Sequence, residues 1–133
     1  MKKIVLLLIA ACSLFASGID WPHDYKAALK EAEKEDKLVY VLLTSENCRW
    51  CRKFENTTLQ EKQIQERLAK EFVVVHISRE IDFVPENFET TPVPRHYFVN
   101  SKGEILYDSL GHRGVECFDA FMDNAQDNLK VSE

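Results

Sequence analysis

The chain has 133 residues, of which 45% are hydrophobic and 11% aromatic, and its formal net charge is −5. This length suits one domain, and the apolar content is ample for a packed core. An acidic chain without a basic stripe is poorly suited to neutralise phosphates, so nucleic acid is excluded as a partner. The sequence contains no repeats and no Gly/Ser-rich linker.

Residues 1–18 read MKKIVLLLIAACSLFASG, a basic start followed by a short apolar run and small residues. This layout is typical of a secretory signal peptide, and the apolar run is shorter than the roughly 20 residues of a membrane span. Cleavage after Gly18 predicts a mature domain over 19–133, located in the periplasm or secreted from a bacterial cell. In an alternative interpretation, the tetrapeptide IAAC resembles a lipobox, and a lipid on Cys12 would anchor the protein.

Hydrophobic periodicity predicts alternating helices and strands along the rest of the chain. Helices are expected over 22–36, from about 50, from a capping box at 58–61, and over 115–129. Strands are expected over 38–43, 72–77, 97–99 and 104–108, with a turn at 100–103 that makes the last two antiparallel. This order predicts an α/β fold with a central mixed sheet flanked by helices on both faces.

Two of the four cysteines fall in the segment CRWC, Cys48 to Cys51, directly after the apolar strand 38–43 and at the start of a helix. A bridge that closes so short a loop constrains the unfolded chain little, so it would be a poor structural staple. Haem attachment needs a histidine after the second cysteine, where this chain has Arg52. A zinc clip needs two further ligands, and the sequence has neither a second Cys-x-x-Cys nor a histidine cluster. A redox pair is therefore the leading interpretation.

The position of this pair suits thiol–disulfide exchange. A thiolate is the attacking species, and a helix N-terminus stabilises it through unpaired N–H groups and a partial positive charge. Arg49 and Arg52 add cationic charge nearby. We therefore predict that Cys48 is the nucleophile, with a pKa below that of a free thiol, and that Cys51 is the resolving thiol.

Nearly all of 19–133 resembles the thioredoxin superfamily. The resemblance is carried by the apolar strand before the CRWC segment, the helix after it, and the pair Val93-Pro94 before the third strand. It implies a thioredoxin fold in which Pro94 has a cis peptide bond and faces the cysteines, although Pro92 could take that role instead. It also implies that the backbone of Val93 pairs with an extended substrate, while Trp50 either contacts the substrate or packs on the site loop.

The segment CRWCRKFENTTL is similar to the site region of the C-terminal thioredoxin-like domain of DsbD, which favours a reducing role. The chain departs from thioredoxin at two positions. Asn47 stands where thioredoxin has a tryptophan, and Leu42 stands where it has a buried aspartate that serves as a proton acceptor. Glu46 is a candidate substitute for that carboxylate, and a solvated surface position is the simpler interpretation.

The third cysteine of the mature domain, Cys117, is expected to be a small buried residue near the start of the last helix. The sequence as a whole predicts an exported thiol–disulfide oxidoreductase that exchanges disulfides with protein substrates and binds neither metal nor cofactor. A membrane-bound electron donor or acceptor is a further expected partner. Two other function classes stay open: a copper or zinc carrier that uses the same cysteines with His96, and a binding or chaperone module with dispensable cysteines.

Overall fold

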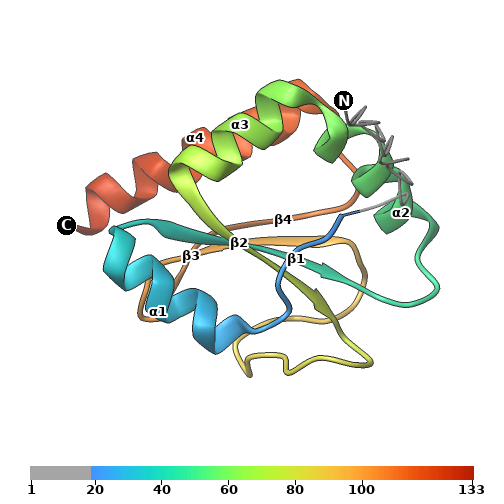
Figure 1. The fold of residues 1–133 in the computed structure, drawn as a ribbon, viewed down its shortest axis with the longest axis horizontal. Coiled ribbons are helices and arrows are strands. Elements are labelled where there is room, and N and C mark those ends of the chain that lie inside the picture. Colours follow the sequence, from blue (N-terminus) through green and yellow to red (C-terminus); the bar gives the residue numbers. More distant parts are fainter. Residues whose placement is uncertain (1–18) are drawn as a thin grey trace, which may run out of the picture.

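The computed structural model describes residues 19–133, which form a four-stranded sheet with helices on both sides (Figure 1). The expected signal peptide and the alternative lipid site at Cys12 lie outside the described residues. In chain order, the elements are α1 (Tyr25–Glu35), β1 (Leu38–Thr44), α2 (Arg49–Asn56), the 3-10 turn η1 (Thr58–Gln60), α3 (Lys62–Glu71), β2 (Phe72–Ser78), β3 (Arg95–Val99), β4 (Ile105–Leu110) and α4 (Val115–Ser132). Among the helices of 19–133, none combines the length and apolar character that a membrane span requires.

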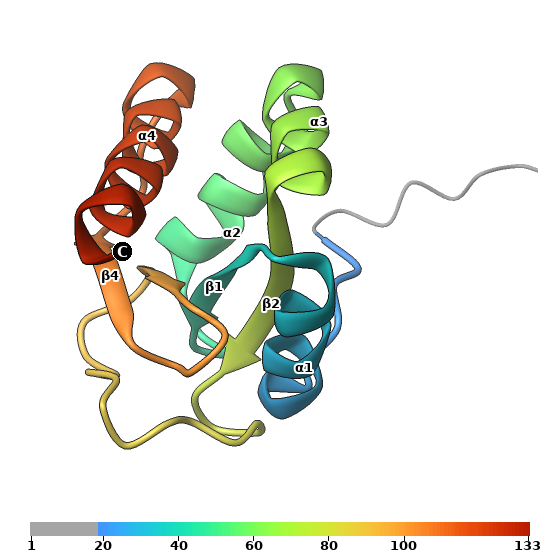
Figure 2. The same ribbon diagram turned by 90° about the vertical axis from the view of Figure 1, so that its left-hand side faces the viewer.

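The sheet has the strand order β2-β1-β3-β4. β1 lies in its interior, parallel to β2 and antiparallel to β3, and β3 pairs with β4 in the antiparallel direction. α1 covers one face of the sheet, whereas α2, α3 and α4 cover the other (Figure 2). The predicted α/β fold, with a mixed sheet flanked by helices on both faces, is confirmed.

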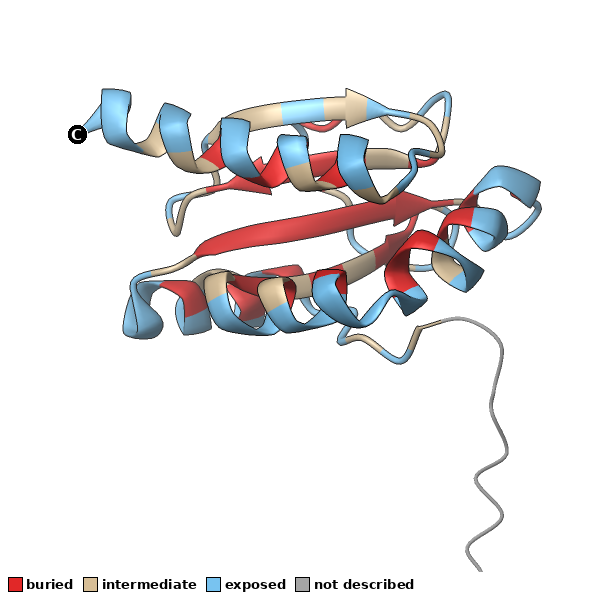
Figure 3. Cartoon of the chain, turned by 90° about the horizontal axis from the view of Figure 1, so that it is seen from above, coloured by how far each residue is buried: buried red, intermediate tan, exposed pale blue. Residues whose placement is uncertain are grey.

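β1 shows how the two faces of the sheet are built, because all seven of its residues are buried (Figure 3). Successive side chains of a strand point to opposite faces. Tyr40 and Leu42 therefore enter the core under α2–α4, whereas Val41 and Leu43 enter the core under α1. The apolar run expected over 38–43 is thus a strand covered on both faces.

The expected capping box at Thr58–Glu61 is wrong. Thr58 begins the 3-10 turn, and α3 begins only at Lys62, without a side-chain hydrogen bond from its cap residue Glu61. The Thr58 hydroxyl instead donates to the backbone carbonyl of Arg113 at 2.6 Å. Because a buried hydroxyl must find a partner, its tertiary bond to the segment before α4 replaces the local cap.

Cys117 is exposed, so the expectation of a buried role is wrong. The inward face of α4 is formed by residues that recur at helical spacing: Phe118, Phe121, Met122 and Ala125. Cys117 immediately precedes Phe118, and consecutive helix residues point about 100° apart. Its side chain therefore lies outside the buried stripe.

Candidate active site

The Cys48–Cys51 disulfide lies between the end of β1 and the start of α2. Cys48 is the N-cap residue of α2, with an extended backbone, and its Sγ accepts a hydrogen bond from the backbone N–H of Cys51 at 3.1 Å. Both cysteines are buried, with 6% of Cys48 and 2% of Cys51 exposed. An N–H group of the first helical turn therefore points at the Cys48 sulfur, which is the arrangement that stabilises a thiolate.

Trp50 projects from the start of α2 with 49% of its surface exposed. The guanidinium carbon of Arg49 lies 5.3 Å from the centroid of its ring, and the ammonium of Lys53 lies 5.1 Å from it. The same ring also stacks on His112, with 6.2 Å between the two centroids. Trp50 is thus both exposed and packed, with cations on its flanks.

The proline segment lies against Trp50. The peptide bonds before Pro92 and Pro94 are both cis, so the two prolines weighed from the sequence share this geometry. Pro92, Val93 and Pro94 line a groove of about 320 Å³ with Trp50, and its remaining walls are Leu110, Gly111 and His112. The structure therefore brings Trp50, Val93 and Pro94 to one place beside the CRWC segment.

Arg79 and Glu80 connect the loop before Cys48 with the proline segment. On one side, a carboxylate oxygen of Glu80 accepts from the backbone N–H of Glu46 at 3.2 Å. On the other side, Nη1 of Arg79 donates to the carbonyl of Thr90 at 2.8 Å. Nε of Arg79 donates to Glu80 at 3.1 Å, so one linked pair of side chains ties the loop before Cys48 to the segment before Pro92.

The side chain of Glu46 is exposed, and it takes part in none of the ion pairs found within residues 19–133. Its backbone carbonyl accepts from Nη1 of Arg52 at 3.1 Å, which steadies the loop before Cys48. This agrees with the simpler of the two interpretations, a solvated surface glutamate. Leu42 is fully buried, so no carboxylate enters from the position that carries one in thioredoxin.

A different carboxylate, Glu55 on α2, approaches the site, and it was not among the candidate residues predicted from the sequence. Glu55 follows Cys51 by four residues, so the two side chains lie on the same face of the helix. Its side chain is 12% exposed. Burial raises the pKa of Glu55, and the nearby Arg52 lowers it in part. The spacing from Cys51 was the available signal, but an acidic residue in a charged helix segment did not stand out.

His76 of β2 contacts Glu55. Its Nε2 is 2.8 Å from the Thr44 hydroxyl and 3.8 Å from a carboxylate oxygen of Glu55. Burial first, and then the nearby His23, lower the pKa of His76 to about 4, although Asp82 acts in the opposite direction. His76 is therefore neutral near neutral pH, and its contact with Glu55 is not an ion pair.

His96, the histidine invoked for a metal carrier, is fully buried and has both ring nitrogens occupied. Nε2 donates to the carbonyl of Gly111 at 2.8 Å, and because a carbonyl can only accept, Nδ1 accepts from the Tyr40 hydroxyl at 2.7 Å. His96 thus offers no free lone pair to a metal ion. Within 19–133, no three His, Cys, Asp or Glu side chains gather in a metal-binding arrangement.

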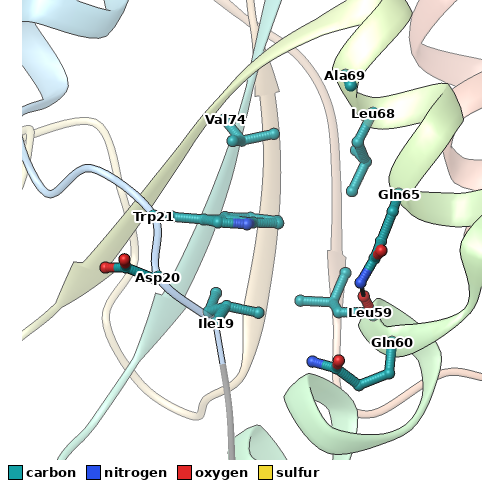
Figure 4. Close-up of a pocket in the computed structure, with 9 residues that line it drawn as sticks. All are labelled: Ile19, Asp20, Trp21, Leu59, Gln60, Gln65, Leu68, Ala69 and Val74. Atoms are coloured by element: carbon teal, nitrogen blue, oxygen red, sulfur yellow. Dashed lines mark hydrogen bonds between the residues drawn. The ribbon is translucent and has the colours of Figure 1, made fainter. Parts of the chain in front are cut away.

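A separate pocket of about 330 Å³ lies between the segment 19–21 and α3 (Figure 4). Trp21 and Leu68 form apolar walls, and Gln65 adds an amide. Its lining contains neither a cysteine nor a histidine, so it brings no thiol chemistry of its own.

The sheet, the CRWC disulfide and the proline segment define a thioredoxin-like protein, similar to oxidoreductases of that fold. Residues 12–86 match the family described as "Thioredox_DsbH: Protein of unknown function, DUF255". The match covers more than half of the chain, and the chain belongs to this family.

Solved structures agree with this assignment. The structure titled "DsbH Oxidoreductase" aligns with a TM-score of 0.66 at 18% identity, covering 84% of this chain and 87% of that chain. The oxidised C-terminal domain of Neisseria meningitidis DsbD aligns with a TM-score of 0.60 at 21% identity, covering 79% and 99%. At these identities the likeness shows the fold.

A curated relative is similar over a shorter stretch. Human spermatogenesis-associated protein 20 is 31% identical over 62 residues, which is 47% of this chain and 8% of that protein. The chain therefore spans less than a tenth of the length of that relative.

Proposed function

We propose that this protein is a thiol–disulfide oxidoreductase that exchanges disulfides with protein substrates through Cys48 and Cys51, without a bound cofactor. The observation that carries the proposal is the hydrogen bond from the Cys51 N–H to the Cys48 sulfur at the start of α2. It supports Cys48 as the nucleophile, because the helix N-terminus favours the thiolate over the thiol. The family match and the fold shared with DsbH add support.

In the reducing direction, the cycle begins with both thiols free. The Cys48 thiolate attacks one sulfur of a substrate disulfide, forms a mixed disulfide, and releases the other substrate sulfur as a thiolate that takes up a proton. Cys51 then loses its proton and attacks the Cys48 sulfur, which forms the intramolecular disulfide and releases the second substrate thiolate. The substrate gains two electrons and two protons, and an external dithiol must return them to Cys48 and Cys51.

The proline side of the groove is proposed to hold the substrate. The backbone of Val93 forms none of the turn and loop hydrogen bonds of residues 19–133, so it is available to pair with an extended peptide. Trp50 lies across the groove and offers an exposed apolar face. A substrate strand paired with Val93 would thereby lie between Trp50 and Pro94, next to Cys48.

Glu55 is proposed to take the proton of Cys51 during the second attack. It lies one helical turn from Cys51 on the same face of α2, and its raised pKa brings the carboxyl closer to the pKa of a thiol. His76 and Thr44 form the polar floor on which this carboxyl rests. Glu55 would thus take the role for which the sequence offered Glu46 as a candidate.

We further propose that the mature domain of residues 19–133 acts outside the cytoplasm as a reductase and receives electrons from a membrane-bound dithiol. The leader-like residues 1–18 and the fold shared with the DsbD domain support this proposal. Trapping the in vivo redox state tests the direction. A reductase is held mainly as the dithiol in growing cells, whereas a mainly oxidised pool would indicate an oxidase.

Turnover of insulin disulfides with dithiothreitol as the electron source tests the exchange activity. The wild-type protein is expected to accelerate insulin reduction above the rate of dithiothreitol alone. The Cys48→Ser/Cys51→Ser double variant is the matched control and is expected to add nothing. Equal rates for the two proteins would refute the proposed function.

A further inference from the structure

The groove beside the disulfide is apolar at its walls. Trp50 lines it together with Val93 and Pro94, and Leu110 and His112 belong to the same lining. A volume of about 320 Å³ accommodates one large apolar side chain. His112 also carries a polar atom, Nδ1, which is buried and has no hydrogen-bond partner within residues 19–133.

The rim of this groove on the α2 and α4 side is cationic. Arg49 and Lys53 lie over the Trp50 ring, and Arg113 directly follows His112. All three cations are exposed, and none takes part in an ion pair among the described residues. Burial, followed by the charges of Lys53 and Arg113, lowers the pKa of His112, which agrees with a locally positive potential.

The positive charge of this cationic rim is opposite in sign to the net charge of the protein. The 17 Lys and Arg of the full sequence include Lys2 and Lys3, so residues 19–133 carry 15 basic against 22 acidic side chains, a net charge of −7. Three unpaired cations around one apolar groove therefore stand out from their acidic background. Such a local field attracts anionic partners and repels cationic ones.

We infer that the groove selects a substrate segment in which an apolar side chain and an acidic side chain flank the reacting cysteine. The apolar side chain enters the groove between Trp50 and Pro94, and the carboxylate faces Arg49, Lys53 and Arg113. This inference rests on the proposed function, since it names the substrate class of the same site. Charge complementarity acts chiefly on the rate of encounter, so the selectivity is expected to weaken as salt is raised.

The test uses matched peptides that each carry one cysteine as a mixed disulfide with 2-mercaptoethanol, a neutral leaving group. One peptide has Phe and Asp beside the cysteine, and its partner has Phe and Lys. The reduced protein is expected to react roughly threefold to tenfold faster with the acidic peptide at low salt, and the ratio is expected to approach one at high salt. Each rate is divided by the rate with bis(2-hydroxyethyl) disulfide, which reports thiolate reactivity alone.

Charge reversal sharpens the test. Lys53→Glu and Arg113→Glu are each expected to lower the acidic-to-basic ratio, and the double variant is expected to invert it. Lys34→Glu on α1, across the sheet, is the matched control and should keep the wild-type ratio. A wild-type ratio near one at low salt, with normal reaction of the small disulfide, overturns the inference and leaves the proposed function intact. No reaction with any of the disulfides would instead overturn the proposed function.

Discussion

The two faces of the sheet are built from alternate residues of the same strands, yet they differ in polarity. Under α1, β1 and β2 contribute only aliphatic side chains: Val39, Val41, Leu43, Val73, Val75 and Ile77. Under α2–α4, the same two strands contribute Tyr40, Thr44 and His76, whereas β3 adds one polar ring to each face, His96 here and Tyr97 under α1. Burying polar groups costs stability unless each is hydrogen-bonded. The polar side chains that β1 and β2 bury thus all lie under the helices that include the cysteine-bearing α2.

The largest expected effect is on turnover, and it comes from replacing either of the two cysteines beside the polar face. Cys51→Ser is expected to stop turnover and to accumulate a mixed disulfide with substrate, because attack by Cys48 proceeds and resolution does not. Cys48→Ser is expected to stop turnover without any trapped adduct. Non-reducing electrophoresis followed by mass spectrometry measures both outcomes. An adduct formed equally by both variants would contradict the assignment of Cys48 as the nucleophile.

On the aliphatic face, Leu43→Ala is expected to lower the free energy of unfolding by about 2–5 kcal/mol, since a fully buried leucine leaves a cavity. Urea denaturation measures this loss. The folded variant should keep the wild-type redox potential, because Leu43 belongs to the face away from the disulfide helix. A shifted potential would show that the two faces are not separate in function.

The polar face makes stability depend on pH through His76 and His96, whose pKa values are both lowered to about 4, chiefly by burial. An unfolded histidine titrates near pH 6.5, so between these values the unfolded state binds more protons than the folded state. Stability is therefore fully present above pH 6.5 and is lost as the pH falls toward 4. The fall from about 6.5 to about 4 corresponds to roughly 3 kcal/mol for each histidine, so the loss is expected to reach about 6 kcal/mol in total by pH 4.

Urea denaturation at several pH values measures this slope. The matched variant His76→Gln should flatten part of the dependence, whatever its effect on stability at neutral pH. An identical slope for the variant and the wild type would show that His76 does not contribute to the pH dependence of stability.

The smallest expected effect concerns Glu55. Glu55→Gln is expected to slow the second step, resolution by Cys51, by about tenfold, because the proton acceptor is lost. Stopped-flow kinetics that separate mixed-disulfide formation from its resolution measure the effect, and Glu46→Gln is the matched control. Burial raises the pKa of Glu55, so above that pKa its ionised carboxylate destabilises the folded state. The free energy of unfolding of Glu55→Gln at neutral pH should therefore exceed that of the wild type. Slower resolution in Glu46→Gln than in Glu55→Gln would reverse the assignment.

Much of the fold followed from the sequence. The buried run that became β1 and the cysteine pair at the start of α2 depend on local periodicity and on short spacing, and both were predicted. The proximity of Val93 and Pro94 to Trp50 came from the family resemblance, because it joins segments far apart in the chain.

Two of the failures have a common cause, since they depend on contacts between distant segments. Thr58 bonds to Arg113 in place of capping α3, and no local pattern reports that partner. The Glu55–His76 contact likewise requires that α2 lies over β2. Cys117 is the exception, because helical phase relative to Phe118 would have placed it on the exposed side.

The redox equilibrium of the Cys48–Cys51 pair in glutathione buffers of graded potential tests the central claim most directly. We expect one two-electron transition, absent from Cys48→Ser, at a potential between about −270 mV, as in thioredoxin, and about −120 mV, as in DsbA. A pair that stays oxidised or reduced throughout the graded buffers would contradict the claim that this disulfide is made and broken in function.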